Sequence, residues 1–157
     1  MKHLIVGNGA AGIFAAKKIR HIDPQCEIVV VSSSAHRLFA KPRLPEYLAG
    51  SCSIEDLMLF PKDWYEKQRI DMILGATITD VDRRNKTVVT DGNRDFSYDK
   101  LLLALGGSPY RLPIFGGNSE RIFTINSIED IDDIRRSADV SRSAVVIGGG
   151  LLGIETA

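Results

Sequence analysis

The hydrophobic residues of the first thirty positions alternate between strand-like and helix-like spacing. Two short stretches, Leu4–Val6 and Glu27–Val31, are expected strands; the first is wholly apolar and the second is β-branched and apolar after Glu27, as in parallel strands that are buried on both faces. Between them, apolar residues at helical spacing predict a helix over Ala10–Ile22, which stops before Pro24 because the residue ahead of a proline avoids the helical conformation. Strand, helix and strand in this order form the unit from which parallel sheets are built.

The next forty residues are less regular. Residues 36–48 hold two prolines and several cations, which predict a stiff, positively charged loop and a poor helix start. Ser53–Leu57 has the capping residue and early acids of a helix N-terminus, and Lys62–Ile70 is predicted to be a second short helix. We expect its aromatic residues, Trp64 and Tyr65, to pack against the protein and not to contact a cofactor.

From Ala76 onward the spacing becomes strand-like. Turn residues separate the expected strands, and Asp91-Gly92 is a strong hairpin signal. The pattern predicts an antiparallel three-stranded insertion, followed by another buried parallel strand. The expected strands are Ala76–Asp82, Lys86–Thr90, Arg94–Ser97 and Lys100–Leu105.

The last stretch repeats the opening pattern. A helix is predicted over Ile128–Ala138, and a second glycine-terminated strand over Ala144–Ile147. The sequence then stops at Ala157, so the second strand–helix–strand unit, which takes ~30 residues, is incomplete in it. We therefore expect a first domain over residues 1–112, a connector and helix over 113–142, and the beginning of a second, truncated domain over 143–157.

Composition narrows the class of protein. The 157 residues are 44% hydrophobic and 25% charged, which is ordinary for a globular protein with a core. Twenty Lys and Arg balance twenty Asp and Glu, so no global field favours nucleic acid. Cys26 and Cys52 are too few and too isolated for a disulfide framework or a metal site. Because no segment approaches the ~18 apolar residues of a membrane span, we expect a soluble, cytoplasmic protein.

The first strand ends in a glycine motif. Gly7, Gly9 and Gly12 have the spacing G-x-G-x-x-G. Gly7 allows a tight turn, Gly9 lets the backbone approach a pyrophosphate, and Gly12 lets the helix pack close to the strand. The helix start, at Ala10 and Ala11, then points free N–H groups at the phosphates. A plain strand–helix turn is the alternative, but the complete strand–helix–strand context favours dinucleotide binding.

A second motif with the same spacing follows the expected strand Ala144–Ile147, at Gly148, Gly150 and Gly153. Two such motifs about 140 residues apart indicate two dinucleotides, one per domain. The predicted fold class is α/β. It comprises a Rossmann-like domain, with a parallel sheet, helices and the antiparallel insertion, and the start of a second Rossmann-like domain.

Three further stretches supply candidate ligand contacts. Dinucleotide folds usually place an acid after the second strand, whereas this chain has Ser32–Ser34, whose hydroxyls either bind the ribose or only cap the strand end. Lys41 and Arg43 are expected near the pyrophosphate or the reactive ring of a cofactor, with a solvated basic loop as the alternative. Gly106 allows a ligand to approach the backbone at the carboxyl edge of the sheet.

Taken together, these motifs resemble the FAD-dependent pyridine nucleotide-disulfide oxidoreductases, flavoproteins that bind two dinucleotides. The resemblance rests on the two glycine motifs, the antiparallel insertion and the strand Leu101–Gly107, in this order. Lys41–Leu44 looks like the Arg-Pro loop of the branch that holds NADH:rubredoxin reductases, ferredoxin reductases and the flavin domain of assimilatory nitrite reductases. The resemblance spans essentially the whole chain.

The resemblance implies an FAD site in residues 1–112 and the opening of an NAD(P)H site in residues 143–157. In FAD binding, the first glycine turn would hold the pyrophosphate, a serine the adenosine ribose and Ile78 the adenine, while Gly106 would close on the flavin side. The residues implied for FAD are Gly7, Gly9, Ala10, Ala11, Gly12, Ser33, Ser34, Lys41, Pro42, Ile78, Ala104 and Gly106. Those implied for NAD(P)H are Gly148, Gly150 and Gly153.

The chain departs from the family pattern at three places. Leu105 replaces a threonine, and the loop in which disulfide reductases carry a redox-active cysteine has none here. Glu46 stands where related reductases have a lysine, which pairs there with the glutamate that matches Glu155. Because neighbouring carboxylates repel each other, we expect Lys41 or Arg43 to supply the counter-charge.

The implied reaction is hydride transfer from NAD(P)H to FAD, with electrons passed to a redox partner such as rubredoxin, ferredoxin or a nitrite-reducing centre. No side chain is needed as an acid or nucleophile, so Lys41 and Glu155 are candidates only for tuning the flavin. The alternative is a non-catalytic FAD-binding fragment that is inactive as the isolated chain. A dehydrogenase that uses NAD alone would leave the second motif unexplained. Apolar surface on an incomplete flavin domain would also allow a homodimer.

Overall fold

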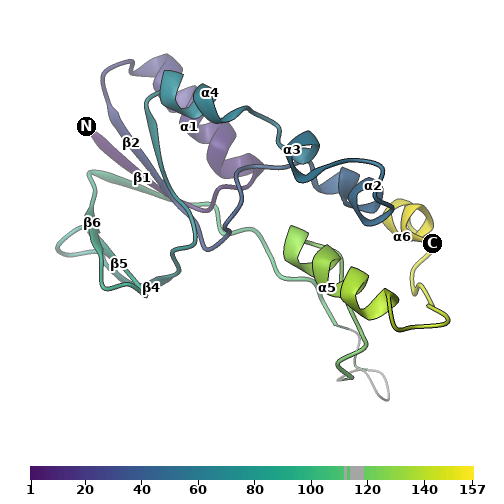
Figure 1. The fold of residues 1–157 in the computed structure, drawn as a ribbon. Coiled ribbons are helices and arrows are strands. Elements are labelled where there is room, and N and C mark those ends of the chain that lie inside the picture. The colour runs from purple at the N-terminus through teal and green to yellow at the C-terminus, as the bar shows by residue number, and fades with distance from the viewer. Residues whose placement is uncertain (112, 114–118) are drawn as a thin grey trace. The chain divides into compact units, whose positions relative to one another are not determined.

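The computed structural model describes residues 1–111, 113 and 119–157 (Figure 1). The chain forms two compact units. The first unit contains residues 1–39 and 59–106, and the second contains residues 40–58 and 107–157. Each unit therefore draws on two separate stretches of the sequence.

A four-stranded parallel sheet forms the centre of the first unit. Its strands, in spatial order, are β3 (Ile70–Ile73), β2 (Glu27–Val31), β1 (Lys2–Val6) and β7 (Lys100–Leu103). Every pairing in this sheet is parallel, so the carboxyl ends of all four strands lie at one edge. The two central strands are the continuous apolar runs predicted from the sequence, because a strand with neighbours on both sides and layers on both faces has no exposed face.

Layers cover both faces of this sheet. The helices on one face are α1 (Ala10–Ile22) and α4 (Lys62–Lys67). The core on the helix side holds Ile5, Ile13 and Tyr65, whereas Leu4 and Val88 belong to a second core on the opposite face. Neighbouring residues of β1 enter different cores because successive side chains of a strand point to opposite faces.

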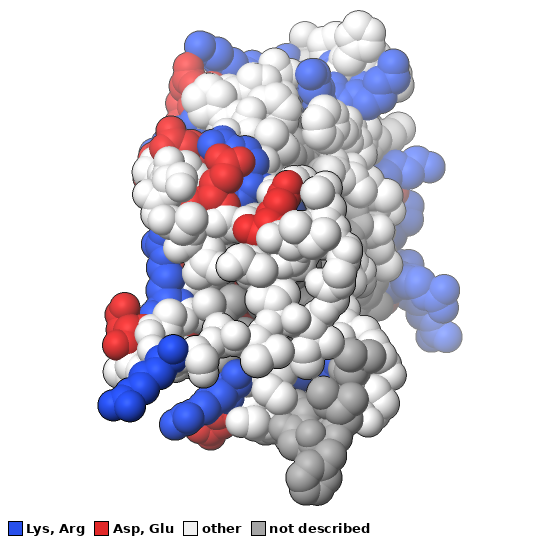
Figure 2. Space-filling view, turned by 90° about the vertical axis from the view of Figure 1, so that its right-hand side faces the viewer, with Lys and Arg blue, Asp and Glu red and all other residues white. Residues whose placement is uncertain are grey.

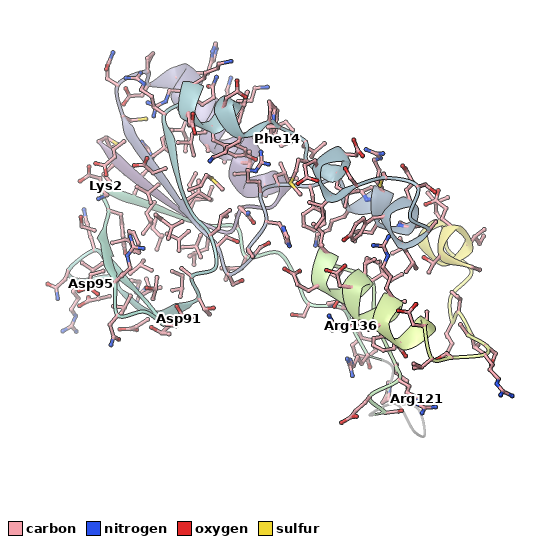
Figure 3. The ribbon with its side chains drawn as sticks, viewed as in Figure 1. Lys2, Phe14, Asp91, Asp95, Arg121 and Arg136 are labelled. Atoms are coloured by element: carbon pink, nitrogen blue, oxygen red, sulfur yellow. The ribbon has the colours of Figure 1, made fainter. Side chains whose placement is uncertain are left out.

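A small antiparallel sheet forms the layer on the second face (Figure 1). Its strands, in order, are β4 (Ile78–Asp82), β5 (Thr87–Thr90) and β6 (Asp95–Ser97). The turn between β5 and β6 closes with the Asn93 N–H donating to the Thr90 carbonyl at 2.9 Å. Asp91 lies in this turn and Asp95 begins β6 (Figure 3). The predicted three-stranded insertion is confirmed.

The aromatic residues of α4 pack against the first unit, as expected. The Phe60 and Trp64 rings are stacked with centroids 4.0 Å apart, and Tyr65 is buried in the helix-side core. Phe14, on α1, meets the Phe60 ring edge-on at 6.0 Å between centroids and is half exposed (Figure 3).

The regular elements described in the second unit are all helices. Its elements are the short 3₁₀ helix η1 (Lys41–Arg43), α2 (Leu44–Leu48), α3 (Ile54–Leu57), α5 (Ile128–Ala138) and α6 (Leu151–Thr156). Helices α3 and α5 both begin in a capping box, in which Ser53 or Ser127 exchanges hydrogen bonds with an aspartate three residues later. Helix α2 packs beside α5, and the Tyr47 hydroxyl donates to Asp132 Oδ1 at 3.1 Å.

Three local predictions are wrong. Residues 41–48 are helical and not a loop, because Pro42 and Pro45 each lie in the first turn of a helix, where a missing N–H breaks no hydrogen bond. The helix predicted to end at Ile70 ends at Lys67, and β3 follows it, paired with β2.

The third error concerns residues 144–147, which form no strand in the described structure. Val145 is 87% exposed and Ile147 is 70% exposed, so this apolar run has no neighbouring strand to pair with. An extended segment without a hydrogen-bonding neighbour is not a β-strand.

The surface carries both signs of charge. On the face that Figure 2 shows, cationic and acidic side chains are interspersed among uncharged ones, in keeping with the balanced composition. Among the residues described, no helix is long and apolar enough to span a membrane.

Candidate dinucleotide-binding site

The carboxyl edge of the parallel sheet brings three predicted stretches together within the first unit. The first glycine turn follows β1, Ser32–Ser34 follows β2, and Ala104–Gly106 follows β7. The chain runs outward from β1 through β2 to β3 and then returns to place β7 on the other side of β1. The crevice outside the strands at such a switch point is where open α/β sheets bind ligands.

The protein's own packing requires two of the three motif glycines. Gly7 has φ +105°, and a Cβ added there would lie 2.1 Å from the Ala104 carbonyl oxygen. A Cβ on Gly12 would lie 1.9 Å from the Gly7 carbonyl oxygen, so any side chain would push α1 off the strand. Both distances are far shorter than a van der Waals contact, and both positions therefore accept only glycine.

Gly9 differs from its two neighbours in the motif. It has ordinary extended dihedrals (φ −68°, ψ −177°), and apart from its two chain neighbours no described residue has an atom within 4 Å of where its Cβ would be. The fold itself places no steric demand on this position. Open space beside a glycine at a helix start leaves room for a ligand to reach the backbone, and this fits the pyrophosphate of a dinucleotide.

The start of helix α1 provides the favourable electrostatic environment for a phosphate at this site. Gly9 is its N-cap, no side chain caps it, and its first turn holds no acidic residue. Gly9, Ala10 and Ala11 are exposed. The first N–H groups of a helix carry a partial positive charge, so this uncapped, exposed start attracts a phosphate.

The loop after β2 holds the serines that sequence reasoning associated with the ribose. Ser34 is occupied internally, because its hydroxyl donates to the His36 carbonyl at 3.2 Å and accepts from the His36 N–H at 3.1 Å. Ser32 is buried. Ser33 is exposed, and its hydroxyl has no hydrogen-bond partner within the part of the chain that the structure describes. Of the three, Ser33 has the hydroxyl available to a ligand.

Sequence reasoning missed Asn8, which lies within the glycine motif. This side chain is buried and bonds both Ser32 and His36 across the edge of the sheet. A polar residue between two glycines, at a position that phosphate binding leaves unspecified, was the available signal.

The remaining residues predicted to contact FAD in the first unit lie on two elements. The Ala104 N–H donates to the Val6 carbonyl at 2.8 Å, so Ala104 extends the pairing of β7 with β1. Gly106 is exposed and has φ +70°, a conformation that favours glycine. Ile78 begins β4 and packs against the core on the antiparallel side.

In the second unit, the cations of the basic segment have separate partners. Lys41 Nζ donates to Asn126 Oδ1 at 2.8 Å. The Arg43 guanidinium donates two hydrogen bonds to the Glu46 carboxylate, from Nη2 to Oε2 at 2.8 Å and from Nε to Oε1 at 3.2 Å. This pairing holds the pKa of the Glu46 carboxyl below its usual range. Arg43 thus supplies the counter-charge to Glu46, while Glu155 lies exposed on α6.

The second glycine turn has the local geometry of the first. Gly148 has φ +131°, and a Cβ on Gly153 would lie 2.1 Å from the Gly148 carbonyl oxygen. Gly150 is the N-cap of α6, with extended dihedrals and no side-chain cap. The turn and the helix start predicted for the NAD(P)H motif are therefore formed, whereas its strand is not.

A cavity of about 410 Å³ lies at the opposite end of the first unit, beside the amino ends of β2 and β3. Its wall includes Arg20, which is 8% exposed and donates to backbone carbonyls of Cys26 at 2.7 Å and of Gln68 and Arg69 at 2.8 Å. These bonds tie the end of α1 to the starts of β2 and β3. The cavity is remote from the glycine turn, and its buried arginine has a structural role.

The position of the glycine turn defines the class of protein. A motif that closes on its own strand and helix but leaves Gly9 open, at the switch point of a parallel sheet, marks an α/β protein that binds a dinucleotide. A family model described as "Pyridine nucleotide-disulphide oxidoreductase" matches residues 1–157. The chain belongs to this family of oxidoreductases, which use FAD and NAD(P)H. The resemblance stated from the sequence is confirmed.

Named relatives agree with this assignment. The assimilatory nitrate reductase electron transfer subunit of Bacillus subtilis is 37% identical over 155 residues, which are 98% of this chain and 20% of the relative. The NADH-rubredoxin oxidoreductase of Clostridium acetobutylicum is 33% identical over 156 residues, 99% of this chain and 40% of that protein.

A solved structure shows the same fold. The reductase chain matched in the crystal structure of the covalent putidaredoxin reductase–putidaredoxin complex has a TM-score of 0.84 at 33% identity. The match covers 99% of this chain and 38% of that one. The chain thus spans between about a fifth and two fifths of the length of these proteins.

Proposed function

We propose that residues 1–112 form the FAD-binding part of an NAD(P)H-dependent flavin oxidoreductase that passes electrons to a redox partner. The observation that carries the proposal is the contrast within the first glycine motif. Gly7 and Gly12 are closed by the protein's own atoms, whereas Gly9 opens onto free space at an uncapped helix start. A turn that served packing alone would not need its central glycine.

The roles of the residues follow from what each offers to the ligand. The N–H groups at the start of α1, from Ala10 onward, would hold the pyrophosphate, and Ser33 would bind the adenosine ribose. Ile78 would line the adenine side, and Ala104 and Gly106 the flavin side. The ribose contact would be neutral because the chain has a hydroxyl where dinucleotide folds usually have a carboxylate.

When bound, FAD would supply the redox chemistry by accepting a hydride from NAD(P)H and releasing electrons to an acceptor. Gly148, Gly150 and Gly153 would open the NAD(P)H site of a second domain that begins at residue 143. The start of α6 would bind the phosphates of NAD(P)H, because its N-cap residue is Gly150 and no side chain caps its N–H groups. Lys41, Pro42 and Glu155 are proposed as flavin-side residues on the family resemblance.

The proposed acceptor is a small redox protein or a fused redox domain. The supporting observation is that one relative is named for rubredoxin, another is an electron transfer subunit, and a structural neighbour was solved with putidaredoxin attached. Reduction of rubredoxin or ferredoxin by the complete enzyme with NADH or NADPH, followed by absorbance, tests this part.

A second candidate function is FAD binding without turnover by the chain of 157 residues. It is favoured by the state of residues 144–147, which are exposed and form no strand in the described structure. A nicotinamide site needs a sheet edge as well as a glycine turn, and among the described residues the second motif has formed the turn without a strand.

One titration separates these candidates. The purified chain is mixed with FAD, freed of unbound flavin by gel filtration, and its visible spectrum is recorded before and after anaerobic addition of NADH and of NADPH. We expect retained flavin bands at roughly 370 and 450 nm. Bleaching by either nicotinamide supports the oxidoreductase, and retained bands without bleaching support the binding fragment. A chain that retains no flavin overturns the proposal.

A further inference from the structure

Asn8 is a buried polar residue inside the first glycine turn. It stands between Gly7 and Gly9 and is only 8% exposed. A buried polar side chain is destabilising unless its hydrogen bonds are made. Phosphate binding by the turn uses backbone N–H groups and does not need a side chain here, so the role of Asn8 lies elsewhere.

The side chain of Asn8 bonds to the loop that follows β2. Its Nδ2 donates to the backbone carbonyl of His36 at 2.7 Å, and its Oδ1 accepts from the Ser32 hydroxyl at 2.9 Å. With the amide turned the other way, its oxygen would face the His36 carbonyl oxygen. This orientation is therefore the one that satisfies both contacts.

The same loop is fixed from its other side by the residues after β3. The Gly75 N–H donates to the Ser34 carbonyl at 3.0 Å, and Ser34 closes on His36 through its hydroxyl. Asn8 supplies the fixation from the side of β1. Ser33 lies between Ser32 and Ser34, which are both held in this way, and is itself exposed.

We propose that Asn8 is a positioning residue, which sets the ribose-binding loop at a fixed place relative to the phosphate-binding turn. One ligand, the adenosine diphosphate half of FAD, would contact both the start of α1 and Ser33. Its affinity therefore depends on the spacing of the two, which the bonds from Asn8 to Ser32 and His36 maintain. The inference rests on the proposed FAD function.

A double-mutant cycle tests the link. Asn8→Ala, Ser32→Ala and the double variant are titrated with FAD and, separately, with ADP, and their unfolding is measured without ligand. We expect each single change to lower the affinity for FAD by about tenfold. The affinity for ADP should fall by the same factor, because ADP corresponds to the adenosine diphosphate half of FAD that contacts α1 and Ser33. The double variant should lose little more than either single one, because both remove one network.

The matched control is Asn85→Ala. Asn85 lies exposed in the turn between β4 and β5, where its Nδ2 donates to Asp82 at 2.7 Å. The Asn85→Ala variant should bind FAD and ADP as tightly as the wild type does. Losses that are fully additive between Asn8 and Ser32, or an Asn8→Ala variant that binds as tightly as the wild type, would overturn the inference.

Asn8→Asp supplies a readout that does not depend on how well Asn8→Ala folds. The charged carboxylate would face the His36 carbonyl oxygen, whereas the protonated acid can donate to it as the amide does. Burial raises the pKa of such a carboxyl. FAD affinity of this variant should therefore rise toward the wild-type value as the pH falls through that pKa.

The wild type is the reference for the pH profile, because it shares the titratable side chain of His36 and the ligand. A profile for Asn8→Asp that is parallel to the wild type contradicts the inference. If the wild type itself binds no FAD, the proposed function fails and this role fails with it. If the wild type binds FAD and the variants bind equally well, the positioning role alone is wrong.

Discussion

The chain contains the same glycine turn twice, but only the first turn follows a strand that is paired in a sheet. Gly7 and Gly148 both have positive φ, at +105° and +131°. In each turn the glycine five residues further on fits tightly, since a Cβ would lie 1.9 Å from the first glycine's carbonyl oxygen at Gly12 and 2.1 Å at Gly153. The spacing of the motif therefore produces the turn and the helix start in both places.

The difference lies in what surrounds the two turns. A Cβ on Gly7 would also meet the Ala104 oxygen at 2.1 Å, because β7 lies beside β1. Apart from its chain neighbours, a Cβ on Gly148 would meet no described residue within 4 Å, and residues 144–147 form no strand. A local motif thus specifies a turn and a helix, but a strand forms only where other strands supply its hydrogen bonds.

The largest expected effect comes from filling the two turns. Gly7→Ala combines an unfavourable positive φ with a collision against backbone, and should lower the free energy of unfolding by roughly 3–5 kcal/mol. Gly148→Ala carries only the positive φ and should cost about 1 kcal/mol. Urea denaturation of both variants measures the difference. Equal losses would show that the sheet does not distinguish the turns.

The second effect compares two arginines. Arg20, in the first unit, is 8% exposed and donates to the backbone carbonyls of three residues, Cys26, Gln68 and Arg69. Arg43, in the second, is only partly buried; it pairs with Glu46 and donates to one backbone carbonyl, that of Asp56. Arg20→Met leaves buried carbonyls without donors and should destabilise the fold by roughly 2–3 kcal/mol. Arg43→Met should change stability much less, because exposed ion pairs contribute little. A larger loss for Arg43 in thermal unfolding would reverse this ranking.

The smallest effect is a pH dependence in the second unit. Hydrogen bonding to Arg43 lowers the pKa of Glu46, so the pair adds stability above the pKa of an unfolded glutamate and loses it as the pH falls through the folded pKa. In Arg43→Gln the Glu46 pKa should return toward its ordinary value, measured by NMR titration. An unchanged Glu46 titration would show that the pairing does not persist in solution.

Elements with local signals could be predicted from the sequence. The bounds of α1, β2 and α5 agree with the prediction, because helical spacing, a capping serine or a proline marks their ends. Strand β3 could not be predicted in the same way. It is four residues long, contains Asp71, follows a helix closely, and owes its state to pairing with β2.

The residues of the candidate site also fall into those with a local sequence signal and those that depend on contacts distant in the sequence. The glycine spacing and the serines after β2 are contiguous patterns, so the sequence alone pointed to them. The roles of Asn8 and Arg20 depend on partners 24 and 48 residues away, at Ser32 and Gln68, which only the fold brings together. Ser34 stays a ribose candidate, and the bonds of its hydroxyl to His36 are a further contact that only the fold shows.

The central claim is that the first glycine turn holds the pyrophosphate of FAD, and Gly9→Ala tests it most directly. The dihedrals of Gly9 suit any residue, and apart from its chain neighbours no described residue lies within 4 Å of its Cβ position. The free energy of unfolding should therefore stay within about 0.5 kcal/mol of the wild type. FAD affinity should nevertheless fall by at least about tenfold, because the methyl group occupies the approach to the phosphates. Gly92→Ala, another glycine with open space around its Cβ, should bind FAD as the wild type does. A Gly9→Ala chain that binds FAD as tightly as the wild type would contradict the account.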